Sequence, residues 1–388
     1  MKFINNSNDL ATYLNLNILK NVNIKNISVD TRTIKKDSLF IAIKGKNFDG
    51  NNFVDQAFKK GAVLAIVDNK KFSNSKNKKI IFVPNTLKAL EKISKNIIKN
   101  YPKNAHPMDT TRSSISHMGL EDPETEDNSK EANYRKAVRL LSKISTAVAA
   151  NFRCRKGQKI IEPDKNLSFS ENFFHMCFGK IPSQEVVKAF DVSMILYAEH
   201  SFNASTFTSR VIASSLSDMH GAVVGAVASL KGPLHGGANE AVMHMLNEIK
   251  GPDQAEEWMM NKIKNKGLVM GFGHRVYKKG DSRVPTMTKY YEKTAAFFKN
   301  EKLPKTSQIL RDVMIREKNI YPNLDFPAGP TYYLMGFDID FFTPIFVVSR
   351  ITGWTAHIIE QFANNRLIRP LSAYNGADHR RVRELKDR

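Results

Sequence analysis

The chain changes character at residues 101–104, and this change constrains its fold more than any other feature of the sequence. Before that point, short apolar runs of strand length predominate, whereas after it nearly every apolar pattern has the 3.6-residue period of an amphipathic helix. The strand-like runs are residues 39–43, 63–67 and 79–83, and the helix-like runs are 53–60, ending at Gly61, and 86–100. This order predicts a small α/β unit with one sheet and helices packed on it.

The part after residue 105 is predicted to be mainly helical. Its helical patterns cover residues 133–152, 184–197, 206–230, 239–249, 253–264, 286–300, 306–318 and 343–364. Clusters of Gly, Pro and Asp separate them. We therefore expect two domains, an α/β domain over 1–104 and a helical region over 105–388, which contains a smaller domain at roughly 205–320.

Two segments of the second part need an interpretation of their own. Residues 119–130 are acidic and polar, which predicts a surface loop. Residues 211–230 are the nearest approach to an apolar run of membrane-spanning length, but they contain Asp218 and His220. They are predicted to form a buried helix rather than a membrane span.

The formal net charge of +21 would suit a nucleic-acid-binding protein, but its distribution does not. Residues 1–104 hold 20 Lys and Arg against 7 Asp and Glu, and Arg32 is the only arginine among them. This segment is also rich in Asn and Ile, a composition typical of AT-rich codons, and no nucleic-acid-binding motif accompanies it. Cys154 and Cys177 are too few for a disulfide framework, and the first residues lack a signal-peptide pattern. We expect a cytoplasmic protein without nucleic-acid or membrane partners.

Residues suited to catalysis gather in four clusters of the second part. They are residues 199–205, 232–240, 271–278 with 281–283, and 323–329. Each has a plain structural interpretation: Asp325 could be a helix N-cap, and Arg350 and Arg369 could be ordinary ion-pair residues. Taken together, however, histidines and an aspartate repeatedly lie beside Gly or Pro, where backbone and ligand can approach closely. The pattern favours an active site.

In this order and at these spacings, the clusters resemble the citrate synthase family. The most specific pair is Pro233-Leu-His-Gly-Gly-Ala-Asn-Glu240 with Gly271-Phe-Gly-His-Arg-Val-Tyr277. Three further segments look most like the 2-methylcitrate synthase branch: Ser282–Met287, Tyr332–Gly336 and Ile351–His357. The resemblance runs from about Ala105 to the end of the chain. It implies large and small helical domains, truncated at their N-terminus, which here follow the α/β domain of residues 1–104.

The resemblance also implies a reaction, the Claisen-type condensation of acetyl-CoA or propionyl-CoA with oxaloacetate, followed by thioester hydrolysis. No metal or redox cofactor is implied. The implied catalytic residues are His235, His274 and Asp325. Oxaloacetate would be bound by His200, Arg283, Arg350 and Arg369, the last reaching the neighbouring subunit's site in a homodimer. CoA would be bound by Gly267, Leu268, Val269, Met270 and Gly271. A histidine that titrates near neutrality suits proton transfer, and arginine forks suit a dianion.

The first part has a resemblance of its own. The segments that carry it are Ser28-Val-Asp-Thr-Arg32, Asp37-Ser-Leu-Phe-Ile-Ala-Ile-Lys-Gly45, Phe48-Asp-Gly50 and Gly61-Ala62. They are similar to the N-terminal domain of Mur ligases, nearest the ligase that joins UDP-N-acetylmuramoyl-tripeptide to D-alanyl-D-alanine. In that family this domain holds the UDP-sugar end of the substrate. The chain contains no Gly-Lys-Ser or Gly-Lys-Thr of a P-loop, which disfavours ligase chemistry.

The two resemblances meet at residue 104, and the helical one lacks roughly the first hundred residues of its family. Such a join is interpreted either as a gene fusion after deletion or as two neighbouring sequence fragments joined in error. The leading hypothesis is an acyl-CoA:oxaloacetate condensing enzyme. The alternative is an inactive truncated fusion whose N-terminal domain binds a UDP-muramoyl-type nucleotide sugar. Acetyl and propionyl groups differ by one methylene, so the sequence leaves acyl preference open.

Overall fold

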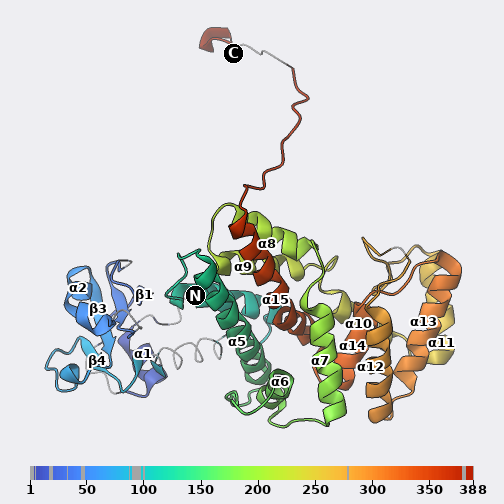
Figure 1. The fold of residues 1–388 in the computed structure, drawn as a ribbon, viewed down its shortest axis with the longest axis horizontal. Helices are drawn as coiled ribbons and strands as arrows, with labels where there is room; N and C mark the ends of the chain where they lie inside the picture. Colours follow the sequence, from blue (N-terminus) through green and yellow to red (C-terminus); the bar gives the residue numbers. More distant parts are fainter. Residues whose placement is uncertain are drawn as a thin grey trace.

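The computed structural model describes residues 4, 6–16, 21–32, 34–44, 49–86, 88–89, 98, 101–277, 279–377 and 382–387. Most of the predicted helix at 86–100 lies outside these residues, as do Gly45, Phe48 and Lys278 of the motifs above. The described elements form two groups in Figure 1, a small sheet with its helices and a larger set of helices.

The first group is a four-stranded parallel sheet in the order β1-β2-β3-β4. Its strands are β1 (Asn26–Ser28), β2 (Ser38–Ile41), β3 (Ala62–Val67) and β4 (Ile80–Phe82), and its helices are α1 (Ser7–Leu14), η1 (Gly50–Phe53), α2 (Val54–Lys59) and η2 (Lys70–Phe72). The predicted sheet is confirmed, although β1 and α1 were missed because both are short and polar.

The alternation of side chains along β2 explains how helices cover both faces of this sheet. Leu39 and Ile41 pack in one apolar cluster with Leu10 of α1, whereas Phe40 packs in another with Val54 of α2. Because successive strand residues point to opposite faces, the two clusters lie on opposite sides of the sheet. Strands of a parallel sheet that is buried on both faces have continuous apolar sequences, as the longer strands of this sheet do.

The second group is helical and has one continuous apolar core. Its helices are α4 (Pro107–Glu121), α5 (Lys130–Arg155), α6 (Phe169–Phe178), α7 (Gln184–Ala198), α8 (Ala204–Ser214), α9 (Met219–Leu230), α10 (Ala238–Glu248), α11 (Pro252–Lys264), α12 (Val284–Phe297), α13 (Lys302–Lys318), α14 (Asp325–Leu334), η3 (Ile339–Phe341) and α15 (Phe342–Ala363), with η4 (Leu385–Asp387) near the end. Helix α15 is central, since it packs against α5, α7, α8 and α9. The predicted fold class is confirmed.

One predicted helix, over residues 206–230, is wrong in extent. The structure divides it into α8 and α9. Leu216 between them has a left-handed φ of 62°, and Asp218 caps α9 by accepting a hydrogen bond from the Gly221 N–H at 2.8 Å. An aspartate that bonds a nearby backbone N–H favours a new helix start over continuation. Among the described residues, no helix is long and apolar enough to cross a membrane.

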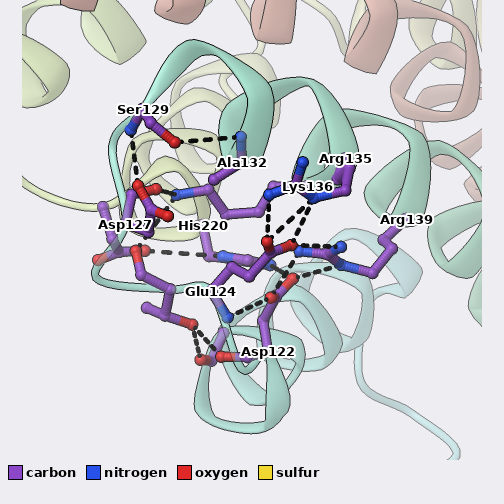
Figure 2. Close-up of polar contacts among 12 residues, drawn as sticks. Asp122, Glu124, Asp127, Ser129, Ala132, Arg135, Lys136, Arg139 and His220 are labelled. Carbon is purple, nitrogen blue, oxygen red and sulfur yellow. Dashed lines mark hydrogen bonds and ion pairs between the residues drawn. The ribbon is translucent and has the colours of Figure 1, made fainter. Parts of the chain in front are cut away.

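The predicted surface loop at residues 119–130 is also partly wrong. Helix α4 extends through Glu121, and the side chain of Asp122 is only 1% exposed. Arg139 of α5 donates two hydrogen bonds to this carboxylate, at 2.9 and 2.7 Å, and His220 of α9 lies 3.4 Å from it (Figure 2). The fully buried Lys136 completes the cluster by donating to the Asp127 carbonyl at 2.7 Å. An acidic composition therefore concealed an ion-pair cluster that joins α4, α5 and α9.

Asp122→Asn is expected to lower the free energy of unfolding by about 3 kcal/mol, because it removes the buried carboxylate and leaves Arg139 paired only with Glu124, which is 2.9 Å away and 25% exposed. This is the low end for such a loss, since the Arg139 side chain is 29% exposed and water can reach it. The measurement is urea denaturation at pH 7, with Asp191→Asn, which removes an exposed pair with Lys188, as the control.

A comparison of the native protein with Asp122→Asn at different pH values tests the same ion pair. Hydrogen bonds from His220 and Arg139 hold the pKa of Asp122 well below its ordinary value of 3.8, against the opposing effect of burial. Its contribution to stability is therefore complete above pH 3.8 and disappears as pH falls through the depressed folded value. We expect the native protein's advantage over Asp122→Asn to shrink below about pH 3.8. An advantage that stays constant would contradict this assignment.

Candidate active site

Arg350 of α15 is a buried guanidinium, 2% exposed, around which the predicted site residues gather. Its Nε donates to the Tyr197 carbonyl at 2.6 Å, and its charge lies 4.8 Å from the Phe346 ring centre. Among the described residues no carboxylate forms an ion pair with it. Burial, with the nearby charge of Arg283 second, lowers the pKa of Arg350 to about 10. A buried cation kept in this state is suited to an anionic ligand.

Asp325 is the first residue of α14, and its carboxyl group is close enough to Arg283 and Arg350 for their charges to affect its pKa. Its Oδ1 accepts a hydrogen bond from the Tyr197 hydroxyl at 2.6 Å, and its backbone N–H donates to Asn323 Oδ1 at 3.1 Å. Burial raises the pKa of Asp325 to about 6, while the Tyr197 hydrogen bond and the two arginines oppose that rise. A carboxylate with a pKa this close to neutrality is a stronger base than an exposed aspartate.

Tyr197→Phe is expected to move the acidic limb of the kcat/KM profile to higher pH. The hydroxyl lowers the pKa of Asp325, so its removal raises that pKa further above 6. Since a base acts in its ionised form, activity should then appear only at higher pH. The profile measured between pH 5 and 9 checks this, with Tyr333→Phe, at an exposed tyrosine of α14, as the control. An unmoved limb would show that Tyr197 does not tune the base.

His235 lies in the turn between α9 and α10, and its tautomer follows from its contacts. The backbone N–H of Ser205 donates to Nε2 at 3.2 Å, so Nε2 is an acceptor and the proton of the neutral ring is on Nδ1. The Ser205 hydroxyl, 2.8 Å from Nε2, is itself held by Asn203 and Trp354. Burial, then the charges of Arg350 and His200, lower the pKa of His235 to about 4. This histidine is a neutral hydrogen-bond donor at pH 7.

His274 and His200 face each other with ring centres 4.9 Å apart. His274 Nδ1 accepts from the backbone N–H groups of Val276 and Tyr277 at 3.0 and 3.1 Å, which leaves the proton on Nε2. The Nε2 of His200 is buried and has no hydrogen-bond partner in the described structure. Burial, with Arg283 and His274 next, lowers the pKa of His200. An unpaired buried nitrogen of this kind is expected where a ligand completes the site.

The His274 loop and the segment before Asp325 are joined by backbone contacts. The Gly273 N–H donates to the Tyr321 carbonyl at 2.8 Å, and the Asn323 N–H to the Gly271 carbonyl at 2.9 Å. Gly271 has a φ of 82°, and a β-carbon there would lie 2.5 Å from a methyl of Val242. Only glycine fits, which explains why the two motifs meet at this point. The predicted CoA segment, residues 267–271, approaches this junction as a loop in which Leu268 is 73% exposed.

The two remaining arginines differ. Arg283 forms a bidentate pair with Asp281, at 3.0 and 2.7 Å, and its Nη1 donates to the Leu196 carbonyl at 3.4 Å. It lies in electrostatic range of His200, Arg350 and Asp325. Arg369 is exposed, in the segment after α15 that extends away from the helices (Figure 1). Within one chain the structure therefore brings together every predicted catalytic and oxaloacetate residue except Arg369.

Comparison with known proteins identifies the fold around this site. Residues 71–371 match the profile of the family described as "Citrate synthase, C-terminal domain". The chain belongs to the citrate synthase family. The 2-methylcitrate synthase of Mycobacterium tuberculosis is 53% identical over 284 residues, which are 73% of this chain and 72% of that protein. The citrate synthase of Mycolicibacterium smegmatis is 52% identical over 73% of this chain and 76% of its own.

Solved structures of the family have the same helical fold. Citrate synthase from Pyrobaculum aerophilum superimposes with a TM-score of 0.69 at 34% identity, over 76% of this chain and 77% of that one. The Thermoplasma acidophilum enzyme, solved as a ternary complex with carboxymethyl coenzyme A and oxaloacetate, gives 0.69 at 32% identity, over 76% and 79%. Residues 23–97 separately match the profile described as "Mur ligase family, catalytic domain". The predicted resemblances to the citrate synthase and Mur ligase families are confirmed, although the matching Mur ligase profile is described as the catalytic domain rather than the predicted N-terminal domain.

The sequence did not reveal the roles of three residues at this candidate site, namely Tyr197, Ser205 and Trp354. Tyr197 reads as a core aromatic at the end of an apolar helix, yet it bonds Asp325. Ser205 lies within a predicted cluster, but nothing in the sequence pairs it with His235 and Trp354. All these partners are at least 30 residues apart in the chain, so only the folded structure brings them together.

Proposed function

We propose that the chain condenses an acyl-CoA with oxaloacetate and hydrolyses the resulting thioester, with propionyl-CoA preferred over acetyl-CoA. The observation that supports the proposal is the buried Arg350, which has no carboxylate ion-pair partner among the described residues, beside His200, whose Nε2 has no hydrogen-bond partner there. An anionic substrate would satisfy both. The names of the relatives, 2-methylcitrate synthase and citrate synthase, support the reaction class.

Carbon–carbon bond formation would begin at Asp325, which removes a proton from the carbon next to the thioester. His235, neutral and protonated on Nδ1, would donate a hydrogen bond to the thioester oxygen as the enol forms. His274 would transfer its Nε2 proton to the oxaloacetate carbonyl oxygen while the new carbon–carbon bond forms. Water then cleaves the thioester and releases CoA. In the condensation Asp325 takes up the proton from carbon and His274 supplies one to the new hydroxyl group. In the hydrolysis one proton of the water passes to the departing CoA sulfur and the other to solvent, so neither step requires a metal or redox cofactor.

Substrate binding would divide between charged side chains and an exposed loop. His200, Arg283 and Arg350 would bind the oxaloacetate carboxylates, since arginine donors match carboxylate geometry. The loop at residues 267–271 would contact CoA through its backbone, just before His274.

The reaction itself is tested by the release of free CoA thiol from purified protein with oxaloacetate and either acyl-CoA. We expect turnover with both, and a higher kcat/KM for propionyl-CoA by about 10- to 200-fold at most, the range that one methylene supplies. Omission of oxaloacetate is the control. A folded protein that releases no thiol with either substrate would refute the proposal.

The site would be completed by a second copy of the chain, with Arg369 contributed by the partner. Its exposure beyond α15 supports this, as do large exposed apolar side chains on α4 and α5, namely Leu120 (77%), Tyr134 (67%) and Val138 (52%). Apolar side chains exposed together on packed helices are typical of an interface.

Mixing two inactive variants tests this arrangement directly. Asp325→Asn and Arg369→Gln should each be inactive alone, yet their mixed dimers should regain activity. In such a dimer one site pairs the intact Asp325 of one subunit with the intact Arg369 of the other. If Arg369 served its own subunit's site, no combination would restore activity. Refolding the two together and assaying CoA release, beside each refolded alone, separates the outcomes.

A second candidate function concerns the sheet domain, which could bind a UDP-muramoyl-type nucleotide sugar without chemistry. The match of residues 23–97 to the Mur ligase family favours it. Titration calorimetry with UDP-N-acetylmuramic acid tests it on the whole chain. Binding heat that Asp325→Asn leaves unchanged would support a nucleotide-sugar site separate from the candidate active site. The absence of binding heat would refute this second function.

A further inference from the structure

A series of polar contacts joins the last turns of α15 to the segment that carries His200. His357 Nε2 lies 3.0 Å from Glu199 Oε1, and Glu199 immediately precedes His200 in the chain. The His357 side chain is only 15% exposed, whereas that of Glu199 is 53% exposed. The histidine is therefore the fixed member of this pair, and the glutamate is the one being held.

The direction of this hydrogen bond follows from Arg210 of α8. Its Nη1 lies 3.2 Å from His357 Nδ1, and a guanidinium can only donate. Nδ1 is therefore the acceptor, and the proton of the neutral ring is on Nε2, where it points to Glu199. Arg210 is held in turn by Glu360 at 2.5 Å and by Gln361 at 3.0 Å. The arginine thus sets the histidine tautomer, and the histidine holds the glutamate.

The backbone of the segment at residues 199–205 is held in place by several further contacts. Ser201 has a left-handed φ of 49°, a conformation that a residue with a side chain adopts only when its surroundings impose it. A β-carbon at Gly353 of α15 would lie 2.4 Å from the Ala198 carbonyl oxygen, so helix and segment are in direct backbone contact. Phe202 adds a third attachment, with its ring centre 5.0 Å from the Arg210 guanidinium and 5.3 Å from His357.

We propose that His357 is a positioning residue for the oxaloacetate site. By holding Glu199, it fixes the backbone of residues 199–205, which presents His200 to the substrate and Ser205 to His235. His357 itself touches no reacting group. The inference rests on the proposed function only for the identity of the ligand, because the anchoring of the segment can be measured without any substrate.

The test compares His357→Leu, which fills the space without a donor, with His357→Gln, whose amide can still donate to Glu199. Relative to the native protein, His357→Leu should raise KM for oxaloacetate roughly tenfold, the loss expected for one hydrogen bond to a charged group. Its kcat should stay within about threefold, because no catalytic group is removed. His357→Gln should restore most of the affinity. His244→Leu, at an exposed histidine of α10, is the matched control.

Two further readouts keep the inference separate from the proposed reaction. Hydrogen–deuterium exchange of residues 199–205 in the ligand-free protein should be faster in His357→Leu and near native in His357→Gln. Calorimetric titration with oxaloacetate should show the same tenfold loss even if the native protein fails to turn over. Exchange and oxaloacetate affinity both unchanged in His357→Leu would overturn the inference. A native protein that binds oxaloacetate but releases no CoA would instead refute the reaction alone.

Discussion

Asp325→Asn is expected to lower kcat by about 1,000-fold, within the range of about 10²–10⁴ that a positioned general base contributes. The amide has the size and shape of the carboxylate but cannot accept the proton from the carbon next to the thioester. Burial raises the pKa of Asp325 to about 6, so the native carboxylate is mostly ionised at pH 7.5 and ready to act. Measuring kcat at that pH with propionyl-CoA and oxaloacetate gives the effect.

The variant should remain folded and should still bind oxaloacetate. The Tyr197 hydroxyl, now 2.6 Å from Oδ1, can donate to an amide oxygen at the same place, so the local hydrogen bond survives. Removal of a negative charge between Arg350 and Arg283 should strengthen rather than weaken the binding of a dianion. A fall in kcat of less than tenfold would show that another group removes the proton.

Most of the candidate site could be predicted from the sequence, because the residues proposed for catalysis lie in local patterns. His235 and His274 stand next to glycines that the fold requires, and those glycines made the clusters visible. Asp325 was visible for a similar reason, since it lies two residues before Pro327 at the start of a helix. Contacts between side chains that are far apart in the chain could not be predicted from the sequence. Tyr197 and Asp325 are 128 residues apart, and no periodicity reports such a contact.

The errors in the fold have related physical causes. Residues 206–230 keep helical spacing across the break between α8 and α9, so periodicity alone continues the helix that Asp218 interrupts. Residues 119–130 look like a solvated loop because the sequence shows the acid Asp122 but not the distant Arg139 and His220 that enclose it. In both places an aspartate has a specific partner, a backbone N–H or a cation, that overrides the average behaviour of its residue type.

Arg350→Met is expected to weaken oxaloacetate binding by about 100-fold or more, while the ligand-free protein keeps nearly its full stability. Removing one member of a buried charge pair between protein and ligand costs about 2–5 kcal/mol of binding free energy. Methionine matches the aliphatic stem, so the packing against Phe346 is largely kept. Calorimetric titration with oxaloacetate measures the affinity, and thermal unfolding without ligand measures the stability.

Affinity for oxaloacetate and stability should respond differently to Arg350→Met, because the positive charge of Arg350 destabilises the protein when no ligand is bound. Burial lowers the pKa of Arg350 from 12.5 to about 10, which corresponds to roughly 3 kcal/mol held against the charged form. Loss of the donor to the Tyr197 carbonyl costs about 1–3 kcal/mol in the other direction, so the net change in stability should be small. Arg316→Met, at an exposed pair with Glu256, is the control for removing a surface arginine. If Arg350→Met instead unfolds the empty protein and Arg350→Lys rescues both fold and affinity fully, then a charge at this position serves stability first. A loss of affinity with an unchanged melting temperature means that the protein keeps this buried cation for its substrate.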